Sequence, residues 1–249
     1  MARLILGIQP AREALRVHAG NVERVFLQAD AGPTLGPTLE GLARYAEARG
    51  VPVEAVPRGD LDRRAAGGRH QGVIAVAPEL RLVSLAEVPV TASPPSLLVA
   101  LDGVMDPQNF GAVIRSAVAL GASAILWPEH SSAPLSPATF RASAGAIEHA
   151  TLCRVPALPE ALFALTERGV TSVALDAQGP VELGALDLTG PVVIVIGAED
   201  RGVRRPVRRA CAHTARLPMA GPIGSLNASV AGALALYEVT RQRARPAPA

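Results

Sequence analysis

Lysine is missing from this sequence: all 24 of its lysine-or-arginine positions are arginine, in a chain of 249 residues. The chain therefore has no P-loop lysine, no Schiff-base lysine and no protein-kinase lysine, which excludes three large classes of enzyme. Gly-x-Gly is absent as well, and with it the fingerprint of dinucleotide-binding domains. Gly-x-Ser-x-Gly is also absent, so the nucleophile elbow of α/β-hydrolases is not expected.

Cysteine and histidine are scarce. Cys153 and Cys211 stand alone, without a paired spacing, which argues against a disulfide framework or a zinc site. The five histidines show neither His-x-x-x-His nor His-Glu-x-x-His, so no metal is expected. The apolar runs are too short to span a membrane, and the N-terminus has no long apolar signal region. We therefore expect a protein of the reducing cytoplasm with no membrane partner.

Aromatic residues make up only 3% of the chain, against 49% for hydrophobic residues, so Leu, Val, Ile and Ala must build the core. The net charge of +2 indicates mild basicity overall. The arginines are nevertheless clustered, and guanidinium groups suit bidentate contacts with phosphate, although an ordinary solvated face would carry the same residues. The largest group is Arg201, Arg204, Arg205, Arg208 and Arg209.

Residues 1–78 alternate between strand and helix patterns, which is typical of a small α/β domain. The expected strands are 4–6, 22–27, 51–56 and 72–76, and the expected helices are 9–18, 37–49 and 60–66. Residues 79–95 mix proline, serine and charged residues, and we interpret them as a linker with one helical turn at 84–87.

A second domain is predicted for residues 96–249. Asn109 stands where a side chain would cap the first of its helices. The repeated order of strand and helix predicts an α/β fold, with a mostly parallel sheet covered by helices on both faces. The expected strands are 97–101, 124–127, 170–175 and 192–196, and the expected helices are 110–120, 137–150, 159–168 and a segment from 228.

Residues 192–237 bring three turns rich in glycine and small residues close together in the sequence. The first begins at Gly197, after a strand of β-branched residues, and the second ends at Gly221. The third, at 224–227, precedes a helix whose apolar stripe contains Leu226, Val230, Leu234 and Tyr237. Exposed backbone groups at such turns can bind a small polar ligand.

These loops carry motifs that resemble the SpoU (TrmH) branch of the SPOUT RNA methyltransferases. Leu101-Asp102-Gly103, followed by Asp106-Pro107-Gln108-Asn109-Phe110-Gly111-Ala112 and Arg115, resembles the first motif. Ile196-Gly197-Ala198-Glu199 with Gly202 resembles the second, and Leu217-Pro218-Met219-Ala220-Gly221 with Ser225-Leu226-Asn227 resembles the third. Near the N-terminus, Gly7-Ile8, Glu13-Ala14-Leu15 and His70-Gln71-Gly72 resemble the substrate-binding domain of the family. The resemblance covers nearly the whole chain.

The resemblance implies features that periodicity cannot show. The C-terminal parallel-sheet domain would contain the deep trefoil knot of SPOUT proteins, and the small N-terminal α/β domain would be similar to ribosomal protein L30e. S-adenosyl-L-methionine would bind in the knot, at Gly197, Leu217 and Leu226. The residues implied for catalysis are Asn109, Arg115, Glu199, Ser225 and Asn227. No metal is implied.

The nearest branch of the family methylates a guanosine 2′-hydroxyl in the peptidyl-transferase loop of 23S ribosomal RNA. The implied partners are that RNA and a second copy of the chain, bound through the knot domain, and not DNA. A transfer RNA 2′-O-methyltransferase of the same branch is an alternative, although the presence of residues 1–78 favours ribosomal RNA. A non-catalytic RNA-binding protein with this fold is a second alternative, against which the intact Asn109, Arg115, Glu199 and Asn227 argue.

Arg115 lies on the expected helix, away from its apolar stripe and roughly 9 Å along the axis from Asn109. A guanidinium group stays charged in proteins, so it is a poor proton acceptor. We therefore expect Arg115 to remain protonated, to contact the phosphate beside the target ribose and to stabilise the developing oxyanion.

Overall fold

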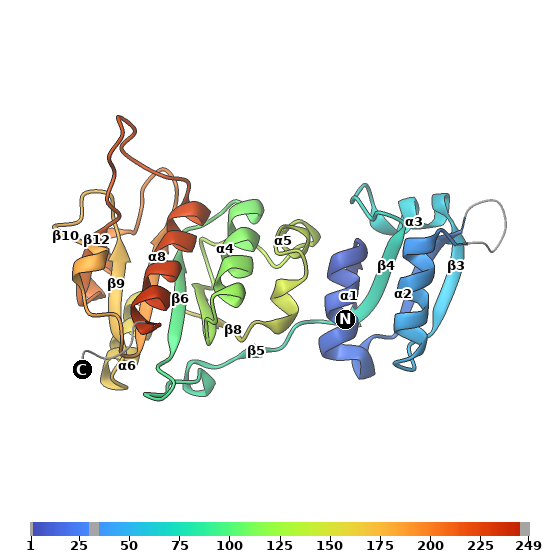
Figure 1. Ribbon diagram of the computed structural model, residues 1–249, viewed down its shortest axis with the longest axis horizontal. Helices are drawn as coiled ribbons and strands as arrows, with labels where there is room; N and C mark the ends of the chain where they lie inside the picture. Colours follow the sequence, from blue (N-terminus) through green and yellow to red (C-terminus); the bar gives the residue numbers. More distant parts are fainter. Residues whose placement is uncertain (1, 30–34, 245–249) are drawn as a thin grey trace. The chain divides into compact units, whose positions relative to one another are not determined.

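The computed structural model describes residues 2–29 and 35–244. The chain divides into two compact units, which are described separately below. The first unit combines Met1–Arg81 with Leu135–His149, and the second combines Leu82–Pro134 with Ala150–Ala249 (Figure 1).

The first unit is built on a four-stranded sheet in the order β1-β4-β2-β3. Strand β4 runs antiparallel to β1 and β2, whereas β2 and β3 are parallel. The strands are β1 (Ala2–Leu6), β2 (Arg24–Ala29), β3 (Val53–Pro57) and β4 (Val73–Pro78), and the helices are α1 (Ile8–His18), α2 (Pro37–Glu47) and α3 (Arg58–Ala65), with a 3₁₀ turn η1 (Ala19–Asn21). The small α/β pattern predicted from the sequence is present, with element ends shifted by a few residues.

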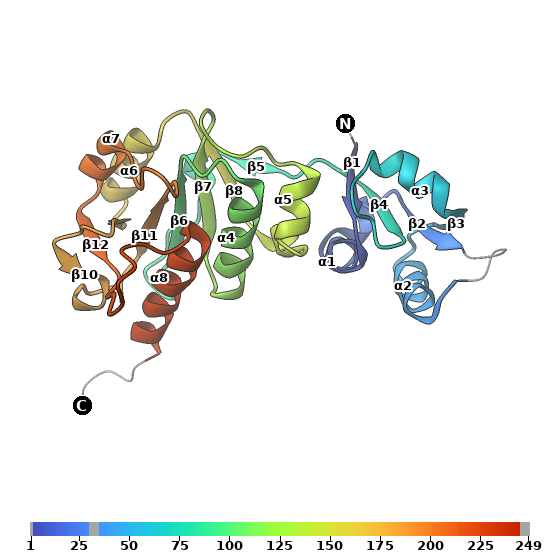
Figure 2. The same ribbon diagram turned by 90° about the horizontal axis from the view of Figure 1, so that it is seen from above.

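Both faces of this sheet are buried, because successive residues of a strand point to opposite sides. Val25 and Leu27 of β2 pack against α1 and α2, and the intervening Phe26 packs against α3. Figure 2 shows α3 on one side of the sheet and α1 and α2 on the other. The unit therefore has two thin cores instead of one.

Residues 135–149 belong to this first unit although they follow β7 in the chain. The helix α5 (Pro137–Ala142) packs on β1, and the 3₁₀ turn η3 (Ala146–His149) packs on α1. The prediction of one helix over 137–150 is wrong, because Ala144 and Gly145 take left-handed φ angles of 50° and 85°. Gly145 allows this segment to lie close to α1, because a Cβ atom at this position would be only 2.9 Å from the Cα atom of Pro10.

A buried ion pair holds this segment in place. Both nitrogens of the Arg3 fork donate to the carboxylate of Glu148, at 2.8 and 2.5 Å. The side chains of Arg3 and Glu148 are only 9% and 1% exposed. His149 contacts Glu13 of α1 at 2.7 Å beside this pair. Charged groups so poorly hydrated are stable only when paired, so the pair fixes η3 against β1 and α1.

The second unit contains an eight-stranded sheet in the order β10-β12-β9-β11-β6-β7-β8-β5, in which neighbouring strands pair in parallel. This confirms the predicted parallel α/β fold. The strands are β5 (Leu82–Val83), β6 (Leu97–Asp102), β7 (Ala124–Pro128), β8 (Leu152–Val155), β9 (Thr171–Leu175), β10 (Val181–Glu182), β11 (Val192–Gly197) and β12 (His213–Arg216).

Helices cover both faces of this sheet, as predicted. The helices are α4 (Pro107–Ala119), α6 (Leu158–Glu167), α7 (Arg205–Ala210) and α8 (Ala228–Arg243), with 3₁₀ turns η2 (Leu85–Glu87) and η4 (Leu183–Ala185). Figure 2 shows α6 and α7 on one side and α4 and α8 on the other. Aliphatic side chains and alanine dominate the core.

Part of this unit differs from the prediction, and several of its short elements were not predicted. The segment interpreted as a linker contributes β5, which pairs with β8, and its predicted helical turn is η2, closed by a capping box between Ser84 and Glu87. The strand β8, the edge strand β10, its neighbour β12 and the helix α7 were not predicted. Each is short, so a periodic pattern has too few residues to be recognised.

Both cysteines are free thiols. Over the described ranges 2–29 and 35–244, the protein contains no helix of the length and apolarity that crossing a membrane requires.

Candidate active site

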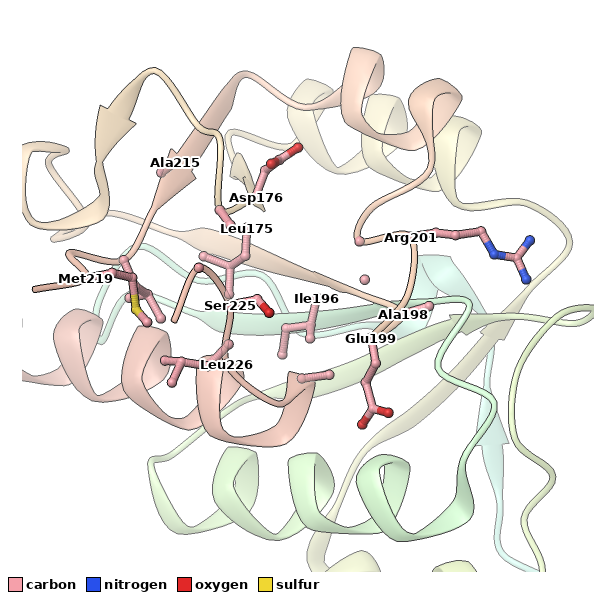
Figure 3. A pocket seen from close by; sticks show the side chains of 17 residues that line it. Leu175, Asp176, Ile196, Ala198, Glu199, Arg201, Ala215, Met219, Ser225 and Leu226 are labelled. Carbon is pink, nitrogen blue, oxygen red and sulfur yellow. The ribbon is translucent and has the colours of Figure 1, made fainter. Parts of the chain in front are cut away.

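A cavity of about 260 Å³ lies at the carboxyl ends of β9, β11 and β12. In a parallel sheet, the loops that follow the strands converge at this edge, which is where α/β proteins bind ligands. The walls come from the loops after these strands and from the start of α8 (Figure 3). Among the lining residues are Asp176, Ile196, Gly197, Glu199, Leu217, Met219, Ser225, Leu226 and Ala231.

Gly197 is required by the way the loop after β11 folds back. A Cβ atom at this position would lie 1.9 Å from the carbonyl carbon of Gly202 and 2.1 Å from the nitrogen of Val203. Ala198 and Gly202 exchange two backbone hydrogen bonds, of 3.2 and 2.8 Å. The tight turn places Glu199 at its tip, beside the cavity.

A buried carboxylate anchors the far end of this loop. Asp102, the last residue of β6, is fully buried. It accepts hydrogen bonds from the backbone nitrogen and from Nε of Arg204, both at 2.7 Å. The two ends of the loop are thus fixed, one by the close approach at Gly197 and the other by Asp102. Asp102 belongs to the first sequence motif, but its neighbours in the sequence give no sign of this anchoring role.

The charge of Asp102 also affects a neighbouring thiol. Burial, and secondly the negative charge of Asp102, raise the pKa of Cys211 to about 12. The thiol therefore stays protonated near neutral pH and is no nucleophile.

The polar side chains of the three motifs meet in one hydrogen-bonded triangle. The amide nitrogen of Asn227 donates to Oδ1 of Asn109 at 3.0 Å and to Oε1 of Glu199 at 2.8 Å. The amide nitrogen of Asn109 donates to the same Oε1. Figure 3 shows Glu199 extending from its loop toward the helices. Since both amides use Oε1, the second carboxylate oxygen has no partner among the residues that the structure describes.

Asn109 does not cap α4, so that prediction is wrong. The helix begins earlier, with Pro107 in its first turn, and the cap is Asp106. The carboxylate of Asp106 accepts from the backbone nitrogens of Gln108 and Asn109, at 3.2 and 3.1 Å. Proline is well suited to this first position because it has no N–H to satisfy. The amide of Asn109 is consequently left to reach Glu199.

The side chain of Asn227 makes two sets of hydrogen bonds. Its Oδ1 caps α8 by accepting from the backbone nitrogens of Ser229 and Val230, at 2.9 and 3.4 Å. Its Nδ2 belongs to the triangle. The start of α8 is therefore tied directly to Glu199 and Asn109.

The structure brings together all of the predicted site residues except Arg115. Gly197, Glu199, Leu217, Ser225 and Leu226 line the cavity, and Asn109 and Asn227 are bonded to Glu199. Arg115 is exposed on α4 and outside the cavity lining, and no hydrogen bond or ion pair joins its side chain to another described residue. Its guanidinium group is available to a ligand.

The cavity fits a nucleoside carrying a polar tail. Leu217, Leu226 and Met219 provide apolar surface for a flat base, and Glu199 and Ser225 provide polar groups. Residues 218–226 make no backbone–backbone hydrogen bond with any described residue, so their N–H and C=O groups can contact the edges of a ligand. S-adenosylmethionine has this chemistry. Within the described part of the chain, no group of three His, Cys, Asp or Glu side chains could hold a metal.

Two family models match the chain. The model described as the SpoU rRNA Methylase family matches residues 96–237, which is more than half of the sequence. The model described as RNA 2′-O ribose methyltransferase substrate binding matches residues 4–83.

Individual relatives agree with these models. A Mycobacterium ulcerans (strain Agy99) protein described as an uncharacterized tRNA/rRNA methyltransferase is 39% identical over 242 residues, covering 96% of this chain and 77% of that protein. The solved structure of an AdoMet-bound rRNA methyltransferase from Sinorhizobium meliloti superposes with a TM-score of 0.77 at 28% identity, over 96% of this chain and 87% of that one. A TrmH/SpoU tRNA modifying enzyme of A. aeolicus covers 59% of this chain and 75% of its own, with a TM-score of 0.54 and 29% identity.

Proposed function

Because the chain belongs to the SpoU rRNA Methylase family, we propose that it methylates the ribose 2′-hydroxyl of a guanosine in the peptidyl-transferase loop of 23S ribosomal RNA. The general reaction follows from family membership: the protein is an S-adenosylmethionine-dependent RNA methyltransferase with a substrate-binding and a catalytic domain. The single observation that carries the chemistry is the Asn109–Glu199–Asn227 triangle beside a cavity of nucleoside character. The intact triangle also speaks against a non-catalytic RNA-binding protein.

Ribosomal RNA is favoured over transfer RNA by the extent of the similarity. The rRNA methyltransferase from Sinorhizobium meliloti covers 96% of the chain and hence both units, whereas the tRNA modifying enzyme covers 59%, which is less than the length of the second unit alone. The first unit also matches a substrate-binding model. A dedicated substrate-binding unit suits a target embedded in a large folded RNA, which is recognised mainly by its shape.

We assign cofactor binding to Gly197, Leu217 and Leu226, with the free backbone groups of the loop before α8. The cofactor supplies a methyl group on a positively charged sulfur. Gly197 keeps the loop tight against β11, and the leucines exclude water from the apolar part of the slot. Ser225 offers a hydroxyl at the cavity wall.

We assign orientation of the ribose to Glu199. Its Oε1 is held by two amides, so its unpartnered Oε2 has a fixed direction and can accept a hydrogen bond from the 2′-hydroxyl. A ribose hydroxyl is a weak nucleophile, and alignment of this kind lowers the barrier by removing rotational freedom before reaction.

Arg115 is assigned to the phosphate beside the target ribose, where it stays protonated and stabilises the developing oxyanion. Arg115→Ala should lower kcat on the order of 10²- to 10³-fold, the usual effect of losing one such donor. Arg115→Lys should fail nearly as badly, because lysine lacks the planar fork. Cofactor affinity, measured by calorimetry, should be unchanged in both variants. Near-normal turnover of Arg115→Ala would remove this residue from the site.

We also propose a homodimer formed through α8. Val230, Leu234 and Tyr237 form an apolar stripe on this helix, and Leu226 extends it from the preceding loop. All four are between 36% and 57% exposed. Apolar side chains repeated along one helix face suit a self-complementary contact with the same face of a second copy. Light scattering should give the mass of a dimer for the wild type and of a monomer for Val230→Glu/Leu234→Glu.

Methylation mapping of ribosomal and transfer RNA from a deletion strain tests the proposed target. The strain should lack one 2′-O-methylguanosine of the peptidyl-transferase loop, and a plasmid copy should restore it. A plasmid copy with Glu199→Ala is the matched control and should not. Loss of a transfer RNA modification instead, with intact ribosomal RNA, would contradict the proposal.

A further inference from the structure

The arginine group of residues 201–209 separates into two kinds in the structure. Three of its members are paired with carboxylates. Arg204 binds the buried Asp102, Arg208 binds Asp176, and Arg201 contacts its neighbour Asp200 at 2.9 Å. The charges of these three are compensated within the chain.

Arg205 and Arg209 have no such compensation. Both are exposed on α7, and neither side chain forms a hydrogen bond or an ion pair with another described residue. Helix α6 packs on α7 and carries Glu160 and Glu167, yet neither carboxylate pairs with these arginines. The two lie four residues apart, so they occupy the same helix face, roughly 6 Å apart along the axis.

Like charges on one helix face repel each other, which makes the pair unfavourable for the isolated helix. The opposite face of α7 explains why the helix forms at all, since Val207 and Ala210 are buried in the core. Burial therefore orients Arg205 and Arg209 outward as a fixed pair. Such a pair is complementary to a partner with closely spaced negative charges.

The position of α7 next to the loop of Glu199 indicates that the negatively charged partner is the RNA substrate. The helix begins at Arg205, directly after the loop 198–204 that carries Glu199. That loop is held rigidly by Asp102. Arg201 extends outward from the same loop in Figure 3, away from Met219 and Leu226. Arg205 therefore follows Glu199 by only six residues, at the end of the same anchored loop.

We infer that Arg205 and Arg209 bind backbone phosphates of the RNA substrate next to the reacting nucleotide. The inference rests on the proposed function, because it places the same substrate on a second surface of the catalytic unit. The recognition is electrostatic and independent of base sequence. Its role is to hold the strand that enters the active site, whereas the paired Arg204 and Arg208 hold the protein itself together.

The test is the salt dependence of RNA binding. Removal of one arginine–phosphate interaction reduces the slope of log Kobs against log salt by about 0.7 for single strands and 0.9 for duplexes. Arg205→Ala/Arg209→Ala should therefore lower the slope by about 1.4 to 1.8 when the dissociation constant for a 23S fragment with the peptidyl-transferase loop is measured between about 50 and 200 mM salt. Cofactor affinity should equal that of the wild type.

Two control variants make the result specific. Arg205→Lys/Arg209→Lys retains both charges and should keep nearly the wild-type slope. Arg154→Ala removes from β8 an exposed arginine that pairs with no other described residue, and the slope should not change. An unchanged slope in the double alanine variant would overturn the inference, as would an equal decrease in Arg154→Ala, which would show a dependence on net charge alone. A wild-type protein that methylates no RNA would instead refute the proposed function.

Discussion

Each unit of this protein contains a buried carboxylate bound by arginine, and the two pairs differ in what surrounds them. In the first unit, Glu148 and Arg3 are both buried and hold η3 to β1. In the second unit, Asp102 is fully buried but the side chain of Arg204 is 42% exposed, and the pair anchors the loop of Glu199. Water can replace a missing partner for Arg204 but not for Arg3. The first pair should therefore determine stability, and the second should determine the geometry of the active site.

The largest effect is expected from Glu148→Ala. Removal of one partner from a buried pair leaves an uncompensated charge, here on Arg3, and typically costs about 3–5 kcal/mol of unfolding free energy. Urea denaturation followed by circular dichroism measures this decrease. The matched control is Glu13→Ala, whose ion pair with His149 is partly exposed and should contribute less than about 1 kcal/mol. Equal stability of the two variants would contradict the distinction between buried and exposed pairs.

Asp102→Asn should lower activity strongly and stability only slightly, which is the reverse of the effect expected for Glu148→Ala. The loop 198–204 loses its charged anchor, and a displacement of about 1 Å at Glu199 lowers kcat on the order of 10²-fold. Unfolding of the second unit, followed by the fluorescence of the buried Trp127, should change by only about 1 kcal/mol because Arg204 becomes hydrated. Normal turnover in Asp102→Asn would show that the loop needs no anchor.

The smallest expected effect is the contribution of the Cys211 thiol to stability at alkaline pH. Its pKa is about 12 in the folded protein, against 9.0 for an ordinary thiol. Because the folded pKa is raised, the contribution of this thiol to stability is complete below pH 9 and is lost as pH rises toward 12. The variant Cys211→Ala should lose less stability than the wild type over this alkaline range. Asp102→Asn should lower the pKa of Cys211, since the charge of Asp102 helps to raise it.

The comparison of the two pairs also explains what the sequence could not reveal. Strands such as β6 and β11 were predictable because their own residues are β-branched or aliphatic and bounded by turns. Asn109, Glu199 and Asn227 could be placed in one site because the motifs that contain them resemble those of a family. By contrast, Asp102 and Arg204 are 102 residues apart, and no local pattern indicates that they are partners.

The errors have similar causes. Residues 137–150 have the composition of a helix, but Ala144 and Gly145 take left-handed angles, and Gly145 lies directly against α1. Asn109 is a good capping residue, yet Asp106 and Pro107 compete for the same helix start and succeed. In the first case the observed backbone overrode the helix propensity of the segment, and in the second a stronger capping signal overrode that of Asn109.

The central claim is that the triangle around Glu199 directs methyl transfer to a ribose 2′-oxygen. The most direct measurement is nucleoside analysis of a 23S fragment containing the peptidyl-transferase loop, after incubation with the wild-type protein and labelled S-adenosylmethionine. We expect the label to be recovered as 2′-O-methylguanosine. We expect Glu199→Gln to bind the cofactor as the wild type does, measured by calorimetry, and to yield almost no labelled product. Label recovered on a base, or full 2′-O-methylation by Glu199→Gln, would contradict this claim.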